Sequence, residues 1–160
     1  MNSGRSSTLI KCARSPAETA ALAGILGPAL KPGDCLLLTG PIGSGKTHFA
    51  RHLIQNLLIE IEDVPSPTYT LVQSYETRLG ELWHADLYRL TGTSEIEELG
   101  LTDAFETAIC LIEWPDRLAE LTPDAALHIT FEADPDQPET RTLSFAWTDP
   151  KWKQRLDGLA

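Results

Sequence analysis

Residues 40–47 have the types and spacing of a loop that holds phosphate groups. They read Gly-Pro-Ile-Gly-Ser-Gly-Lys-Thr and match the pattern G-x-x-x-x-G-K-[ST] at each fixed position. Glycines let successive backbone N–H groups point inward at an anion, and a following helix adds its positive dipole end. Lys46 can reach the β- and γ-phosphates as a catalytic group, and the Thr47 hydroxyl can ligate Mg²⁺. We expect the nucleotide to be bound by Gly40, Ile42, Gly43, Ser44, Gly45, Lys46 and Thr47.

Two other features bear on which nucleotide is bound and how it is sensed. GTP-binding proteins of this type usually carry an N-K-x-D segment, and the chain contains none, which favours ATP. The hydroxyl-rich segment 66–70 follows the helix expected after the phosphate loop. Many P-loop proteins place a switch that senses the γ-phosphate at this position, and we expect the same here.

Two acidic residues at the ends of expected strands are candidates for metal binding and for activating water. Glu113 follows the apolar run 108–112, and Asp86 follows the less apolar segment 82–85. A P-loop site needs a carboxylate at the end of a neighbouring strand to hold the Mg²⁺ shell. One carboxylate would serve the metal, and the other would orient or deprotonate the attacking water. The spacing alone leaves open which residue has which role.

The elements that must position these residues alternate between short strands and helices. Segments 35–38 and 108–112 are fully apolar, which is typical of central parallel strands covered on both faces. Ser15, Pro16 and Glu18 form the start signal of a helix that runs to about Leu30. The remaining expected strands are 8–13, 70–76, 81–87, 127–132 and 142–147, and the remaining expected helices are 46–60, 93–99, 102–106, 115–121 and one starting at 149. We therefore expect an α/β, three-layer P-loop NTPase fold with a mixed, mostly parallel central sheet and an antiparallel hairpin.

Length and composition limit the possible classes of protein. The chain has 160 residues, a usual size for one domain, so we expect a single domain over residues 1–160. Its formal charge of −10 argues against a protein that binds nucleic acid through its own basic face. The longest apolar run has five residues, far short of the roughly 20 needed to span a bilayer, and the N-terminus lacks a signal-peptide core. We expect a cytoplasmic protein that does not associate with membranes, with Cys35 and Cys110 as buried free thiols.

Four strings, taken together, resemble one protein family. They are the phosphate loop, the segment 66–72, the segment His-Ala-Asp-Leu-Tyr-Arg-Leu at 84–90, and Ile-Glu-Trp-Pro at 112–115. Their order and spacing are similar to those of bacterial TsaE (also called the YjeE family), a small ATPase of tRNA threonylcarbamoyladenosine synthesis. The resemblance covers residues 15–131, most of the chain.

The resemblance implies a role for each matching position. It implies that Thr47 is the Walker A threonine, that Glu113 is a Mg²⁺ ligand and that Asp86 takes part in hydrolysis. It also implies that 66–72 is a switch-like segment and that the P-loop fold is atypical, with no separate lid domain. It further implies that the chain joins the TsaB–TsaD pair and hydrolyses ATP there, so we expect contact with tRNA only through the complex. Because no residue is a clear arginine finger, we expect slow turnover by the chain alone.

Two other functions compete with this hypothesis. A small-molecule kinase usually brings lid arginines to the transferred phosphate, whereas the arginines after the phosphate-loop helix are scattered along the chain. A nucleotide-gated binding module with negligible turnover is harder to separate, because no residue is a clear arginine finger. Arg89 is the nearest candidate within the chain.

Overall fold

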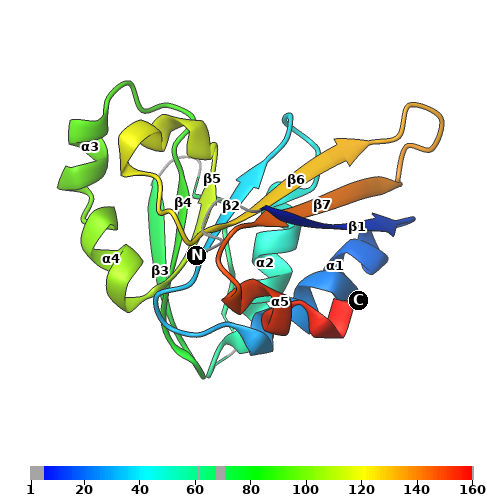
Figure 1. The fold of residues 1–160 in the computed structure, drawn as a ribbon, viewed down its shortest axis with the longest axis horizontal. Helices are drawn as coiled ribbons and strands as arrows, with labels where there is room; N and C mark the ends of the chain where they lie inside the picture. The colour runs from blue at the N-terminus through cyan, green and yellow to red at the C-terminus, as the bar shows by residue number, and fades with distance from the viewer. Residues whose placement is uncertain (1–5, 61, 68–70, 160) are drawn as a thin grey trace.

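The computed structural model describes residues 6–60, 62–67 and 71–159, which form one seven-stranded sheet with helices on both faces (Figure 1). The strand order is β1-β7-β6-β2-β5-β4-β3. The strands are β1 (Ser7–Ala13), β2 (Cys35–Thr39), β3 (Val72–Thr77), β4 (Gly80–Asp86), β5 (Ile109–Glu113), β6 (Leu127–Ala133) and β7 (Arg141–Trp147).

The centre of the sheet is parallel and its two sides are antiparallel. Strand β2 pairs in parallel with both β5 and β6, and β5 pairs in parallel with β4. Hairpins close both sides, because β3 is antiparallel to β4 and β7 is antiparallel to β6, and β1 adds antiparallel to β7. The expected mixed α/β sheet is confirmed, but the sheet is not mostly parallel: three strand pairings are parallel and three are antiparallel, because two hairpins rather than one flank the parallel centre.

The apolar central strands fill two cores because successive side chains point to opposite faces of a sheet. Leu36 and Leu38 of β2 belong to the core under helices α1 (Pro16–Leu26) and α2 (Lys46–Leu57). Cys35 and Leu37 belong to the core on the other face, under α3 (Thr93–Glu98) and α4 (Leu101–Thr107). Figure 1 shows the two helical layers on either side of the sheet, which confirms the three-layer arrangement.

Helix starts follow the sequence more closely than helix ends. The Ser15 hydroxyl accepts a hydrogen bond from the backbone N–H of Glu18 at 3.2 Å, so α1 begins with the expected cap. This helix ends at Leu26, earlier than expected, and a 3-10 turn (η1, Gly27–Ala29) follows it. Helix α2 was expected to reach residue 60 but ends at Leu57, because Leu58 is extended and forms a β-bridge with Thr77.

The C-terminal half ends in short helical segments. The expected helix at 115–121 is a 3-10 helix (η2, Pro115–Leu121). The last helix, α5 (Lys151–Arg155), leads into the 3-10 turn η3 (Asp157–Leu159). Cys12, Cys35 and Cys110 are free thiols, and the last two are buried as expected. None of the helices that the structure describes has the length and apolar character to cross a bilayer.

Candidate active site

The phosphate loop lies where β2 ends and α2 begins, at the edge of the sheet where the parallel strands end. Gly45 has a φ of 103°, a left-handed conformation that glycine adopts without strain, and it precedes the first residue of α2. Gly40 lies close to β6, since an added Cβ would be 2.8 Å from the carbonyl oxygen of Phe131. Glycine is therefore needed at both positions for the loop to close over the sheet.

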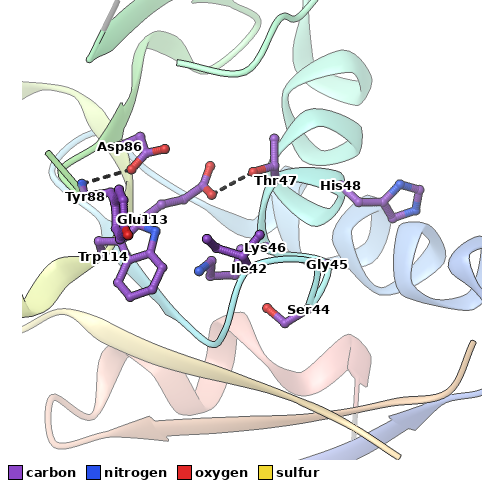
Figure 2. Close-up of a pocket in the computed structure, with 11 residues that line it drawn as sticks. Ile42, Ser44, Gly45, Lys46, Thr47, His48, Asp86, Tyr88, Glu113 and Trp114 are labelled. Atoms are coloured by element: carbon purple, nitrogen blue, oxygen red, sulfur yellow. Dashed lines mark hydrogen bonds between the residues drawn. The ribbon is translucent and has the colours of Figure 1, made fainter. Parts of the chain in front are cut away.

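A cavity of about 470 Å³ opens between this loop and the ends of β4 and β5 (Figure 2). The structure brings together here the residues expected to bind the nucleotide, the metal and water, except Gly40, which lines an adjacent smaller cavity. Arg89, the arginine-finger candidate, is not among the described residues that line the cavity. The lining residues are Ile42, Gly43, Ser44, Gly45, Lys46, Thr47, His48, Asp86, Tyr88, Glu113 and Trp114. The phosphate loop, one cation and two carboxylates thus line a single space.

Glu113 is the last residue of β5 and is only 2% exposed. Its Oε1 accepts a hydrogen bond of 2.7 Å from the Thr47 hydroxyl, shown as a dashed line in Figure 2. Its Oε2 lies 2.7 Å from Nε2 of His84, a fully buried residue of β4. Both carboxylate oxygens are therefore held by neighbouring side chains, one from α2 and one from β4.

Asp86 lies opposite Glu113 on the neighbouring parallel strand and is 7% exposed. Its carboxylate accepts a hydrogen bond of 3.0 Å from the backbone N–H of Tyr88. Its own backbone N–H donates to the carbonyl oxygen of Leu71 at 2.9 Å, which brings the end of the expected switch-like segment beside this residue. Residues 68–70 of that segment lie outside the described residues, so its central part is not assigned a structure.

Lys46 is buried between the phosphate loop and the aromatic side of the cavity. Its Nζ donates to the carbonyl oxygen of Gly40 and lies 4.0 Å from the ring centre of Trp114, a cation–π distance. Burial lowers the pKa of Lys46, although the nearby carboxylates of Glu113 and Asp86 oppose this shift. A phosphate group in the cavity would offer this ammonium a stronger partner than a carbonyl oxygen and a ring face.

Two residues of the site, Trp114 and Arg141, were not among the functional residues expected from the sequence. Trp114 packs partly against the core under α3 and α4 but also lines the cavity, where its ring centre lies 4.8 Å from that of Tyr88. Arg141 of β7 donates from Nε to the carbonyl oxygen of Ser44 at 3.1 Å and from Nη2 to that of Gly43 at 3.2 Å. The contacts of Arg141 join segments far apart in sequence, so no local sequence pattern predicts them.

The oxygen donors of the cavity suit Mg²⁺ when it arrives with a nucleotide. Thr47, Glu113 and Asp86 offer hydroxyl and carboxylate oxygens, the ligands that Mg²⁺ prefers. The residues that the structure describes contain no group of three or more His, Cys, Asp or Glu side chains that could hold a metal alone. An incomplete protein set is typical of Mg²⁺ sites, in which water and substrate phosphates complete the shell.

Comparisons with known proteins agree on one family. Residues 13–143 match the model of the family described as threonylcarbamoyl adenosine biosynthesis protein TsaE. A Rickettsia felis protein named tRNA threonylcarbamoyladenosine biosynthesis protein TsaE is 33% identical over 150 residues, covering 88% of each chain. A Bacillus subtilis protein with the same name is 33% identical over 147 residues, covering 91% of this chain and 90% of its own. The crystal structure of Bacillus subtilis YdiB superposes with a TM-score of 0.78 and 27% identity, over 98% of this chain and 97% of that one.

Proposed function

Since this chain belongs to the TsaE family, we propose that it is a P-loop ATPase that binds and hydrolyses Mg·ATP in the pathway that attaches threonylcarbamoyl to adenosine in tRNA. The observation that carries the proposal is the cavity lined together by Lys46 and Thr47 from the start of α2, Glu113 from the end of β5 and Asp86 from the end of β4. The central parallel strands and the loop between β2 and α2 are consistent with a P-loop NTPase fold.

The triphosphate would lie along the loop 40–47, with Lys46 on the β- and γ-phosphates. Backbone N–H groups at the start of α2 would receive the phosphate oxygens. Thr47 and Glu113 would hold the metal shell, supported by their hydrogen bond to each other. Bound Mg²⁺ would neutralise charge that develops on the transferred phosphoryl group.

Asp86 would orient or deprotonate the attacking water. It lies opposite Glu113 and lines the same cavity, and the described hydrogen bond to the Thr47 side chain is made by Glu113. This arrangement supports the division in which Glu113 serves the metal and Asp86 serves water. The tie between Asp86 and Leu71 gives a route by which the segment 66–72 would respond to the γ-phosphate.

Slow hydrolysis by the isolated chain is part of the proposal. No arginine is among the described residues that line the cavity beside the phosphate loop, and an arginine finger supplied in trans typically raises the rate by about 10³–10⁵. The formal charge of −10 also suits a subunit that meets tRNA only as part of a more basic complex. The TsaB–TsaD pair is the proposed partner.

An ATPase assay with and without purified TsaB–TsaD tests this function. We expect slow turnover by the chain alone and a clear increase when the pair is added. Fast turnover that ignores the pair would indicate an autonomous enzyme. ATP binding with no turnover in either condition would favour a nucleotide-gated binding module.

A further inference from the structure

His84 is a buried polar residue whose presence is not explained by the need to fill space in the core. Its side chain is fully buried on β4, and its only described side-chain contact is the one between Nε2 and Glu113 Oε2 at 2.7 Å. The second ring nitrogen, Nδ1, is buried and has no hydrogen-bond partner among the residues that the structure describes. Buried polar atoms are almost always hydrogen-bonded, and an apolar residue would fill this space without that deficit. We therefore look for the role of the imidazole in its hydrogen bond to Glu113.

The register of the sheet explains how the two side chains meet. Strands β4 and β5 run in parallel, with His84 opposite Leu111 and Asp86 opposite Glu113. Because side chains alternate between faces, His84 and Glu113 both project toward the face that α2 covers. Glu113 thus lies between His84 on one side and Thr47, at the first turn of α2, on the other.

Both hydrogen bonds are donated to Glu113, one by His84 and one by Thr47. An ionised carboxylate only accepts, so Nε2 carries the proton shared with Oε2 and the hydroxyl of Thr47 donates to Oε1. A hydroxyl has one proton and two lone pairs, so donating to Glu113 leaves the lone pairs of Thr47 free for a cation. Glu113 can keep the Thr47 hydroxyl in this orientation only while its own carboxylate plane is fixed.

We propose that His84 is a positioning residue that fixes the carboxylate of Glu113, so that Glu113 in turn orients the Thr47 hydroxyl with its lone pairs toward the Mg²⁺ of Mg·ATP. The inference rests on the proposed function. Outer contacts of this kind commonly change metal affinity or activity by about 10–100-fold when they are removed. His84 does not touch the nucleotide in this account, so its loss acts on the metal and spares the binding of metal-free ATP.

The test uses H84Q and H84N, two amides that differ by one methylene. The glutamine amide nitrogen reaches the position of Nε2, whereas the asparagine amide falls short of Oε2. Titration calorimetry with ATP, once in Mg²⁺ and once in EDTA, gives the ratio of the two affinities. We expect H84Q to keep this ratio within about threefold of wild type and H84N to lower it by about 10–100-fold, with the affinity in EDTA unchanged.

Control variants and melting curves separate positioning from folding. H128N changes a histidine of β6 that lies outside this cavity, and it should leave both affinities unchanged. If H84N is not folded at the temperature of the titration, H84L replaces it, since leucine fills space without a polar atom. If H84N (or H84L in its place) keeps the wild-type ratio of the affinities in Mg²⁺ and in EDTA, or loses both affinities equally, the proposed role of His84 is overturned. A wild-type protein whose ATP affinity ignores Mg²⁺ would instead overturn the proposed metal site itself.

Discussion

Asp34 and Glu113 are two buried carboxylates at opposite ends of the central strands, and the protein surrounds them differently. Asp34 precedes β2 and is 1% exposed. Its oxygens accept from Arg155 Nε at 2.6 Å, Lys151 Nζ at 3.0 Å and the backbone N–H of Lys31 at 2.8 Å. Two cations from α5 thus neutralise this carboxylate and hold the C-terminal helix against the sheet.

Glu113, at the other end, has no such cation. Its partners are the hydroxyl of Thr47 and the ring of His84, and no lysine or arginine in the described part of the chain forms an ion pair with it. Lys46, the nearest candidate, is held by Gly40 and Trp114 instead. Burying a carboxylate without a cation opposes folding, so this end of the sheet keeps a charge that a bound metal can neutralise.

The largest expected effect comes from replacing Asp86, which lies opposite Glu113 at the end of the sheet where the buried carboxylate has no cation. If Asp86 orients or deprotonates water, Asp86→Asn should lower kcat by about 10²–10⁴-fold, the usual contribution of a positioned base, with ATP affinity changed only modestly. Single-turnover hydrolysis and the melting temperature are measured on the same preparation. Normal single-turnover hydrolysis in a folded mutant would remove Asp86 from the catalytic residues.

Replacing each carboxylate by its amide compares the two ends directly. Asp34→Asn leaves Lys151 and Arg155 without their partner and should reduce the free energy of unfolding by about 3 kcal/mol. Glu113→Gln removes an unneutralised buried charge and should leave stability unchanged or higher. Urea unfolding of both variants measures these changes. A larger stability loss for Glu113→Gln than for Asp34→Asn would contradict the comparison.

The same two variants should also differ in how much Mg²⁺ raises their ATP affinity, and here Glu113→Gln should be the more strongly affected. Glu113→Gln should reduce the gain in ATP affinity that Mg²⁺ provides by at least about tenfold, because it removes the charge beside Thr47. Folded Asp34→Asn protein should keep that gain. Calorimetry in Mg²⁺ and in EDTA reports both values, and an unchanged Mg²⁺ gain in Glu113→Gln would make Asp86 the next candidate for the metal.

A smaller effect is expected from Arg141, which supports the phosphate loop from β7. Arg141→Met keeps the apolar stem but removes the donors to the carbonyl oxygens of Gly43 and Ser44. We expect ATP affinity to fall by about tenfold, the loss of roughly one charged hydrogen bond, with the Mg²⁺ gain retained. Arg78→Met, on an arginine that bonds to Asn56 away from the cavity, serves as the control. Equal ATP affinities in Arg141→Met and Arg78→Met would show that the contacts of Arg141 do not support the loop.

Much of the architecture could be predicted because its signals are local. The runs 35–38 and 108–112 are apolar throughout since both faces of β2 and β5 are covered, and the phosphate loop has a fixed pattern. The end of α2 was missed because Leu58 leaves the helix to pair with Thr77, a contact that helical periodicity does not reveal. Boundaries set by such tertiary contacts are the least predictable part of the fold.

In the candidate site, too, the residues with local sequence signals could be predicted, and those that meet only through tertiary contacts could not. Lys46, Thr47, Asp86 and Glu113 stand out through motifs or through their place at strand ends. His84 is separated from Glu113 by 29 positions, and Arg141 from Ser44 by 97. Neither contact has a periodicity or spacing that the sequence displays, so the strand register and the hairpin of β6 and β7 had to be known first.

Calorimetric titration of Mg·ATP into wild type, Lys46→Ala and Lys151→Ala tests most directly whether the cavity is a nucleotide site. Both lysines lie over tryptophan rings, Lys46 over Trp114 and Lys151 over Trp152, but only Lys46 faces the cavity. We expect Lys46→Ala to bind about 10–150-fold more weakly, the loss of ~1.5–3 kcal/mol from a charged hydrogen bond, and folded Lys151→Ala to bind like wild type. Equal affinities in wild type and Lys46→Ala would contradict the assignment of this site.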